Sequence, residues 1–148
     1  ETVGGDIRGK QSAAILIVGG KKVENKWEDK LIDLRVEDHE QPVEELTRVL
    51  RLYRAYKHMD EGDLAMEHSD MKAALKEYDT ALNMFPKNLE MKFWTAVTLA
   101  NNQKIERAIE LFKEVFSVDN NWRLLAERLP KSDLLNISKE KLDKILSL

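Results

Sequence analysis

The spacing of hydrophobic residues changes once along the chain, from a pattern typical of strands to one typical of helices. Residues 12–18 are apolar at almost every position and end at two glycines, which predicts a strand with two apolar faces. Residues 31–36 alternate, with Ile32, Leu34 and Val36 on one face. Two strands alone are marginally stable in water. We therefore expect the helices, a partner chain or another part of the protein to cover this segment on both faces.

From Pro42 onward the apolar residues recur with the period of a helix. Proline suits the first turn of a helix, and the apolar stripe that follows it consists of Val43, Leu46, Val49, Leu50 and Tyr53. The pattern predicts an α+β chain that is mostly α. We expect a β segment over residues 1–40 and a helical domain over residues 41–148.

The helical part repeats itself after 34 residues. Ala74, Tyr78, Ala81 and Pro86 are echoed by Ala108, Phe112, Val115 and Asn120. Small residues let two helices approach, and an aromatic four residues on fills the space one turn away. These residues resemble the tetratricopeptide repeat, with one repeat over 55–88 and a second over 89–122. The resemblance is weaker in the first helix of each repeat, where His58 and Lys92 replace the usual Trp.

Two shorter helices are expected after the repeats, over residues 122–129 and 139–146, separated by Pro130. Terminal helices of this kind close a short helical stack. Trp94 and Trp122 are more typical of core anchors than of ligand platforms.

The tetratricopeptide resemblance implies a concave surface lined by the first helix of each repeat. Its apolar and acidic side chains would suit a peptide with basic and hydrophobic residues. The alternative is that Tyr56, Met59 and Phe93 pack on the neighbouring helix or on the sheet. The expected groove consists of Tyr56, Met59, Asp63, Met66, Glu67, Glu90, Phe93, Val97 and Asn101.

Composition excludes several classes of function. The 148 residues include no cysteine, so disulfides, thiolate metal sites and cysteine nucleophiles are absent. The net charge of −3 gives no general attraction to nucleic acid or anionic membranes, and no apolar run is long enough to span a bilayer. We expect a soluble, cytoplasmic protein without cofactor or metal. The three histidines, His39, His58 and His68, lack the spacing of a metal site and are expected at the surface or as caps.

The segment from Gly4 to Ala13 gathers polar residues around glycines just before the first strand. It is either a glycine turn whose side chains cap the strand or a polar site at the mouth of the strand. In the second strand, Asp33 and Arg35 lie on one face. They form either a structural ion pair or a site where Arg35 meets Asp6 or an anionic ligand.

Three segments, followed by the repeats and by Asn121 to Leu125, resemble the domain of unknown function 1028 family over essentially the whole chain. The three segments are Gly5 to Ala14, Asp33 to His39 and Pro42 to Leu46. The resemblance implies an N-terminal-nucleophile hydrolase fold, an amidohydrolase activity of the longer parent protein, and a C-terminal helical extension that has been linked to peptidoglycan. It also implies residues that would orient the substrate or support the site, namely Asp6, Arg8, Gln11, Ser12, Asp33 and Arg35.

Glu1 is not a nucleophile of this type, which requires Ser, Thr or Cys. We expect a truncated product with no catalytic residue and no hydrolase activity of its own. The leading hypothesis is a helical-repeat interaction module attached to the end of the hydrolase-like domain. One alternative is a hydrolase completed by another chain.

The other alternative is a peptidoglycan-binding module with Tyr56, Phe93 and Asn101 as its sugar platform. Expected partners are a protein or peptide ligand, or the missing N-terminal half. Because a strand with two apolar faces readily pairs with another, we also expect homo-oligomers.

Overall fold

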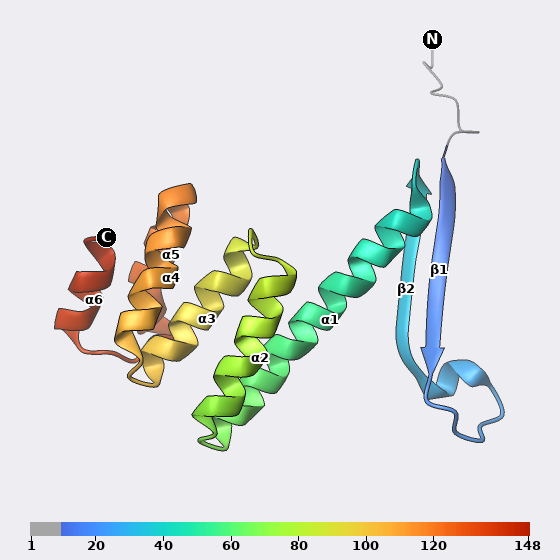
Figure 1. Cartoon of the computed structure of the whole chain (residues 1–148), viewed down its shortest axis with the longest axis horizontal. Coiled ribbons are helices and arrows are strands. Elements are labelled where there is room, and N and C mark those ends of the chain that lie inside the picture. Colours follow the sequence, from blue (N-terminus) through green and yellow to red (C-terminus); the bar gives the residue numbers. More distant parts are fainter. Residues whose placement is uncertain (1–9) are drawn as a thin grey trace, which may run out of the picture. The chain divides into compact units, whose positions relative to one another are not determined.

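The computed structural model describes residues 10–148, and Figure 1 shows them as a hairpin followed by helices. Strands β1 (Gln11–Val18) and β2 (Lys30–His39) pair antiparallel, with Ala13 opposite Val36 and Ile15 opposite Leu34. Both predicted strands are confirmed, and β2 is longer than the predicted 31–36. The prediction of a mostly helical α+β chain is confirmed as well.

The two faces of the hairpin differ in burial. Ile32 and Leu34 are half-buried and Val36 is buried, whereas Leu31, Asp33 and Arg35 are exposed, as the alternation predicts. Leu16 of β1 is 50% exposed, so the described residues leave part of one face of this strand uncovered, and its expected cover by a partner chain or by another part of the protein stays a prediction. The described residues therefore do not cover all the apolar side chains of β1.

The loop between the strands closes on Asp29, a residue that the sequence pattern did not single out. Asp29 ends the short helix η2 (Lys26–Asp29) and is 5% exposed. Its carboxylate accepts a hydrogen bond from the backbone N–H of Lys21 at 2.7 Å, and its carbonyl accepts one from Gly19 at 3.0 Å. A Cβ at Gly19 would lie 2.9 Å from the Asp29 carboxylate, so a larger residue there would require that carboxylate to shift.

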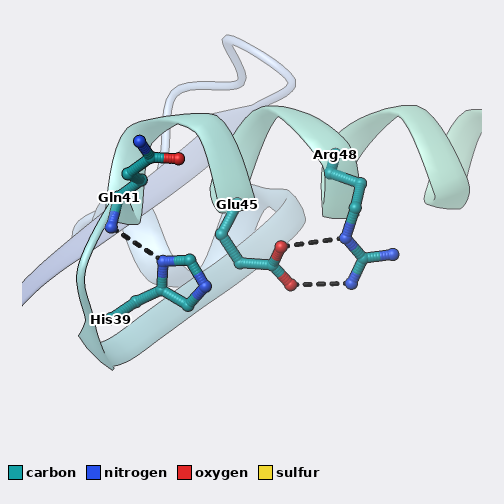
Figure 2. Close-up of polar contacts among 4 residues, drawn as sticks. All are labelled: His39, Gln41, Glu45 and Arg48. Carbon is teal, nitrogen blue, oxygen red and sulfur yellow. Dashed lines mark hydrogen bonds and ion pairs between the residues drawn. The ribbon is translucent and has the colours of Figure 1, made fainter.

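The corner between β2 and helix α1 (Pro42–Glu67) is fixed by local hydrogen bonds (Figure 2). The His39 Nδ1 accepts a hydrogen bond from the backbone N–H of Gln41 at 2.9 Å. One turn into α1, the Arg48 guanidinium donates to both oxygens of Glu45, at 2.9 and 2.6 Å, and lowers the pKa of that carboxyl group. The i, i+3 spacing brings these two side chains together on the helix surface.

Five further α-helices follow α1 and pack in pairs. Asp70, Asn88 and Ser138 each cap a helix by accepting a hydrogen bond from a backbone N–H in the first turn. The predicted terminal helices over 122–129 and 139–146 are confirmed within one residue. The helices are α2 (Met71–Met84), α3 (Leu89–Asn101), α4 (Ile105–Val118), α5 (Asn121–Arg128) and α6 (Lys139–Leu146), with a short helix η3 (Leu129–Ser132) after α5.

The chain forms two compact units, residues 1–54 and 55–148, and α1 contributes to both. The predicted division after residue 40 stays a prediction, although the change from strand to helix occurs at Pro42. In the second unit, Phe93 lies at the centre of an aromatic cluster. The centroid of its ring is 5.3 Å from Trp94, 5.7 Å from Phe112 and 4.9 Å from Trp122. Both tryptophans pack against the core, as expected.

The 34-residue periodicity extends to burial and backbone hydrogen bonds. Ala74, Tyr78 and Ala81 are fully buried, and so are their counterparts Ala108, Phe112 and Val115. After α1, Ser69 adopts a left-handed conformation (φ 59°), and 34 residues later Gln103 does the same after α3 (φ 65°). The hydrogen bonds repeat too: Asp70 N–H to Ala65 C=O corresponds to Lys104 N–H to Leu99 C=O. The two helix pairs therefore share one turn geometry.

The C-terminal helices close the stack through specific contacts. Arg123 of α5 donates a hydrogen bond to the Leu148 carbonyl at 2.8 Å and places its guanidinium 5.3 Å from the centre of the Phe116 ring. Lys141 of α6 donates to the Gln103 side chain at 2.6 Å. Helix α6 contacts both α4 and α5. Within the described part of the chain, no helix is both long enough and apolar enough to cross a membrane.

Candidate functional site

The nine residues of the expected groove divide into a buried and an exposed group. Met59, Phe93 and Val97 are at most 8% exposed and belong to the core, so they cannot line an open groove. The helices of this unit approach closely enough to enclose side chains that an isolated repeat would leave at its surface. This supports the alternative for Met59 and Phe93, which pack against neighbouring helices, whereas Tyr56 is only half-buried.

Asn101 acts as a clasp for the C-terminal segment instead of facing a ligand. Its side-chain amide donates to the Leu134 carbonyl at 3.0 Å and accepts from the Asn136 backbone N–H at 2.7 Å. Both functions of the amide are therefore used within the chain. Two of the three residues expected to form a sugar platform are not available to a ligand, because Phe93 is buried and the Asn101 amide is hydrogen-bonded within the chain.

Three of the four remaining polar members lie along one stripe of α1, and the fourth, Glu90, lies on α3. Tyr56, Asp63 and Glu67 are spaced i, i+7 and i+11, which places them on one face of the helix. Asp60, at i+4, lies on the same stripe and is exposed. Asp60 was not among the expected groove residues, because those were chosen by resemblance to the tetratricopeptide repeat. Helical spacing alone would have found it.

Two tyrosine hydroxyls hold carboxylates of this region in place. The Tyr56 hydroxyl donates to Glu90 of α3 at 2.7 Å, and the Tyr78 hydroxyl donates to Asp63 at 2.6 Å. Burial and the carboxylate partner both raise the pKa of each tyrosine. Each bond uses one oxygen of the carboxylate, and the second oxygen can accept from a ligand. We call the set Tyr56, Asp60, Asp63, Glu67 and Glu90 the acidic strip.

Met66 is half-buried and packs against the core beside this strip. It therefore contributes to packing more than to a ligand surface. Of the nine expected residues, the structure leaves Tyr56, Asp63, Glu67 and Glu90 accessible together.

Away from the acidic strip, α1 and α2 border a hollow of about 740 Å³. His58 and His68 are among the residues that line it. His58 Nδ1 lies 2.6 Å from a Glu77 oxygen, and His68 Nδ1 lies 2.8 Å from the Leu64 carbonyl. The pairing of His58 with Glu77 could not be seen from sequence spacing, because Glu77 lies on the next helix. Among the described residues, no group of three side chains could hold a metal ion.

In the first unit, three of the six residues implied by the family resemblance line one hollow of about 610 Å³. Ser12, Asp33 and Arg35 meet there beside Leu16 and Trp27, the latter 65% exposed. Arg35 Nε lies 3.4 Å from an Asp33 oxygen, which matches the predicted structural ion pair. None of the residues lining this hollow carries an imidazole. The hollow therefore offers an ion pair and an indole for binding, with no histidine base to activate Ser12.

The other three implied residues are not part of this hollow. Gln11 is exposed at the start of β1. Asp6 and Arg8 lie outside the described residues, as does the glycine-rich segment around them up to residue 9. The suggested contact between Asp6 and Arg35 stays a prediction.

Comparison with known proteins identifies one similarity. No curated protein and no solved structure matches the chain. The model of a family of unknown function (DUF1028) matches residues 1–46, which include the whole hairpin and the first turn of α1. The beginning of the chain is therefore similar to a family of unknown function, and helices α2 to α6 lie outside the match.

Proposed function

We propose that residues 55–148 are a protein-interaction module of the tetratricopeptide type, attached to the end of a hydrolase-like domain. Its acidic strip binds a peptide segment that carries lysine or arginine beside hydrophobic residues. The segment on the N-terminal side would belong to an amidohydrolase of the N-terminal-nucleophile type.

The observation that carries the module is the repeat of 34 residues in three independent properties. The same offset relates fully buried side chains, left-handed residues at Ser69 and Gln103, and hydrogen bonds in the turns. Repeats that each bury their apolar face against a neighbour form surfaces suited to binding extended peptides.

The charge of the ligand follows from the acidic strip. Asp60, Asp63, Glu67 and Glu90 are all exposed, and two of them are held by tyrosine hydroxyls. Fixed carboxylates lose less conformational freedom on binding and suit the forked donors of arginine. An acidic ligand would be repelled by the same side chains.

The hydrolase part of the proposal rests on the family resemblance and on the match over residues 1–46. The hollow that brings Ser12, Asp33 and Arg35 together gives some support to a second candidate, in which another polypeptide completes a hydrolase with this hairpin. Hydrolysis that appears only when an N-terminal fragment is added would favour that candidate.

The peptide-binding proposal is tested by fluorescence anisotropy with two labelled peptides, one alternating lysine and leucine and one alternating glutamate and leucine. We expect the basic peptide to bind and the acidic one to bind much more weakly. The double variant Asp60→Lys/Glu67→Lys should weaken binding of the basic peptide roughly tenfold, equivalent to about 1.4 kcal/mol.

A matched control carries the same change of net charge elsewhere. Glu110 of α4 and Glu127 of α5 are exposed and lie outside the acidic strip, so Glu110→Lys/Glu127→Lys should retain most of the binding. The proposal fails if the control weakens binding as much as the strip variant does, or if both peptides bind equally. Circular dichroism of each variant checks that the helices remain folded.

A further inference from the structure

Each of the two repeated helix pairs is joined by a polar bridge that starts from the same repeat position. In the first pair, His58 Nδ1 of α1 lies 2.6 Å from Oε2 of Glu77 on α2. In the second pair, Lys92 of α3 takes the equivalent position, 34 residues later, and donates to Oε2 of Glu114 on α4 at 2.6 Å. The two bridges therefore differ mainly in the cation that forms them.

Both bridges border a hollow. The hollow beside His58 and Glu77 measures about 740 Å³, and the one beside Lys92 and Glu114 measures about 420 Å³. Because side chains do not fill this space, the bridge is the contact that holds the two helices together there.

The two cations respond differently to pH. A lysine keeps its charge at physiological pH, whereas imidazole is the side chain that ordinarily gains or loses its proton between about pH 5 and 8. Protonated His58 forms an ion pair with Glu77, while the neutral ring can only donate a hydrogen bond. Bonds between charged partners are the stronger ones. The His58 bridge therefore holds best in mild acid and weakens as the pH rises through about 6.5.

The other charged groups around His58 favour its protonated form. The hollow also contains a second imidazole, His68, whose Nδ1 lies 2.8 Å from the Leu64 carbonyl, so this ring makes a local contact and not a bridge to α2. The remaining charged lining residues are three carboxylates and one ammonium group, namely Glu61, Asp70, Glu77 and Lys57. The excess of negative charge favours a cation at His58.

Other polar contacts of α2 do not change their charge in this pH range. The Tyr78 hydroxyl donates to Asp63 of α1 at 2.6 Å, and burial together with this carboxylate raises the pKa of the tyrosine, so the hydroxyl keeps its proton. Asp79 of α2 pairs with Arg107 of α4, and a guanidinium stays protonated in proteins. His58 is therefore the pH-sensitive member of these contacts.

We propose that the contact between α1 and α2 is a pH-sensitive joint, closed in mild acid and opening more readily once His58 is neutral, whereas α3 and α4 stay closed at both pH values. The effect should be modest, because partly exposed ion pairs change an equilibrium by roughly threefold. This inference concerns the opening of the first helix pair and is independent of the peptide-binding proposal.

The absence of cysteine allows opening to be measured by thiol labelling of the full chain. Ala74 of α2 and Ala108 of α4 are equivalent in the repeat, and both are fully buried. Ala74→Cys and Ala108→Cys are labelled with an aromatic disulfide at about pH 5.5 and about pH 8, on either side of the imidazole range. Dividing each rate by that of the urea-unfolded chain at the same pH removes the effect of thiol ionisation. We expect the normalised rate at position 74 to be about threefold higher at the higher pH, and the rate at position 108 to stay unchanged.

Exchanging the two cations tests the cause. His58→Lys should abolish the rise at position 74, because the bridge then keeps its charge, and Lys92→His should create a rise at position 108. His68→Gln is the matched control and should leave the rise at position 74 intact. The proposal is overturned if both cysteines show the same rise, if neither shows one, if the rise survives His58→Lys, or if it disappears in His68→Gln.

A second pair of positions keeps the test decisive if a cysteine variant fails to fold. Ala81 and Val115 are also equivalent in the repeat and fully buried, so Ala81→Cys and Val115→Cys take the place of the first pair. Circular dichroism at both pH values shows which variants remain folded.

Discussion

The two units of the chain bury their apolar residues to very different degrees. In the described part of the first unit, Val36 and Pro42 are buried, while Leu16, Trp27 and Leu31 are about half to two-thirds exposed. The second unit encloses complete aromatic side chains, including Tyr78, Phe93 and Phe112. The second unit therefore has a core of its own, whereas the hairpin leaves several large apolar side chains exposed. Burial of apolar area is the main source of stability, so most of the stability should reside in the second unit.

The largest expected effect is the difference in the free energy of unfolding lost when one apolar side chain is shortened in each unit. Phe112→Ala removes a fully buried ring from the second unit and should cost about 3–5 kcal/mol of the free energy of unfolding. Leu34→Ala removes a half-buried side chain from the hairpin and should cost about 1 kcal/mol.

Urea titration followed by tryptophan fluorescence measures both. Trp94 and Trp122 adjoin Phe93 in the second unit, and Trp27 lies in the first unit, so the emission reports on both units. If Phe112→Ala prevents folding, Phe112→Leu gives a measurable loss. Equal losses for the alanine variants at the two sites would contradict the comparison.

Within the second unit, Gly62 should not tolerate a methyl group. A Cβ at this position would lie 2.6 Å from Cδ1 of the fully buried Tyr78 ring. Alanine favours a helix over glycine by about 1 kcal/mol, but overpacking costs about 1–3 kcal/mol. We expect Gly62→Ala to give a net loss of about 1 kcal/mol in chemical denaturation.

Adding Tyr78→Leu tests the cause of that loss. The smaller side chain should remove the clash, so the effect of Gly62→Ala should become neutral or stabilising in the Tyr78→Leu background. An unchanged loss would show that the ring is not responsible.

The clasp formed by Asn101 should have a smaller and more local effect. Asn101→Ala removes hydrogen bonds to Leu134 and Asn136 and should cost about 1–2 kcal/mol. The loss should appear mainly as faster amide hydrogen exchange in α6, while α3 and α4 remain protected. Uniformly faster exchange throughout the second unit would mean that the clasp supports the whole core.

The smallest expected effect is a gain in stability at the turn after α1. Ser69 has a φ of 59°, a conformation that glycine adopts without steric cost. Ser69→Gly should therefore stabilise the chain by about 0.5–1 kcal/mol. Lys113→Gly, in an exposed position in the middle of α4, should destabilise it by a similar amount. Thermal melting of the two variants in opposite directions checks both.

Local patterns predicted the elements well. The alternation at Ile32, Leu34 and Val36 identified a strand, and the helical spacing after Pro42 identified the helices. Six of the eight residues related by the 34-residue offset are completely buried, whereas Pro86 and Asn120 are exposed. These signals depend only on neighbours along the chain, which is why they can be read from one sequence.

The candidate site was harder to predict because it depends on contacts between distant residues. Whether Phe93 faces a groove or the core depends on how closely Trp94, Phe112 and Trp122 surround it. The engagement of Asn101 depends on a segment more than 30 residues later. The enclosure of Asp29 likewise arises from the loop that closes on it, and its own neighbours gave no sign of it.

The clasp at Asn101 also sets the length of any ligand that the acidic strip can hold. Residues 134–136 and helix α6 occupy the end of the stack, so a further helix pair cannot continue it there. A peptide of the proposed kind would then cross the first helices of two pairs, α1 and α3. Packed helices are spaced about 8–10 Å apart and an extended peptide advances about 3.3 Å per residue, which gives roughly three residues per helix. The recognised motif should therefore be about six residues long.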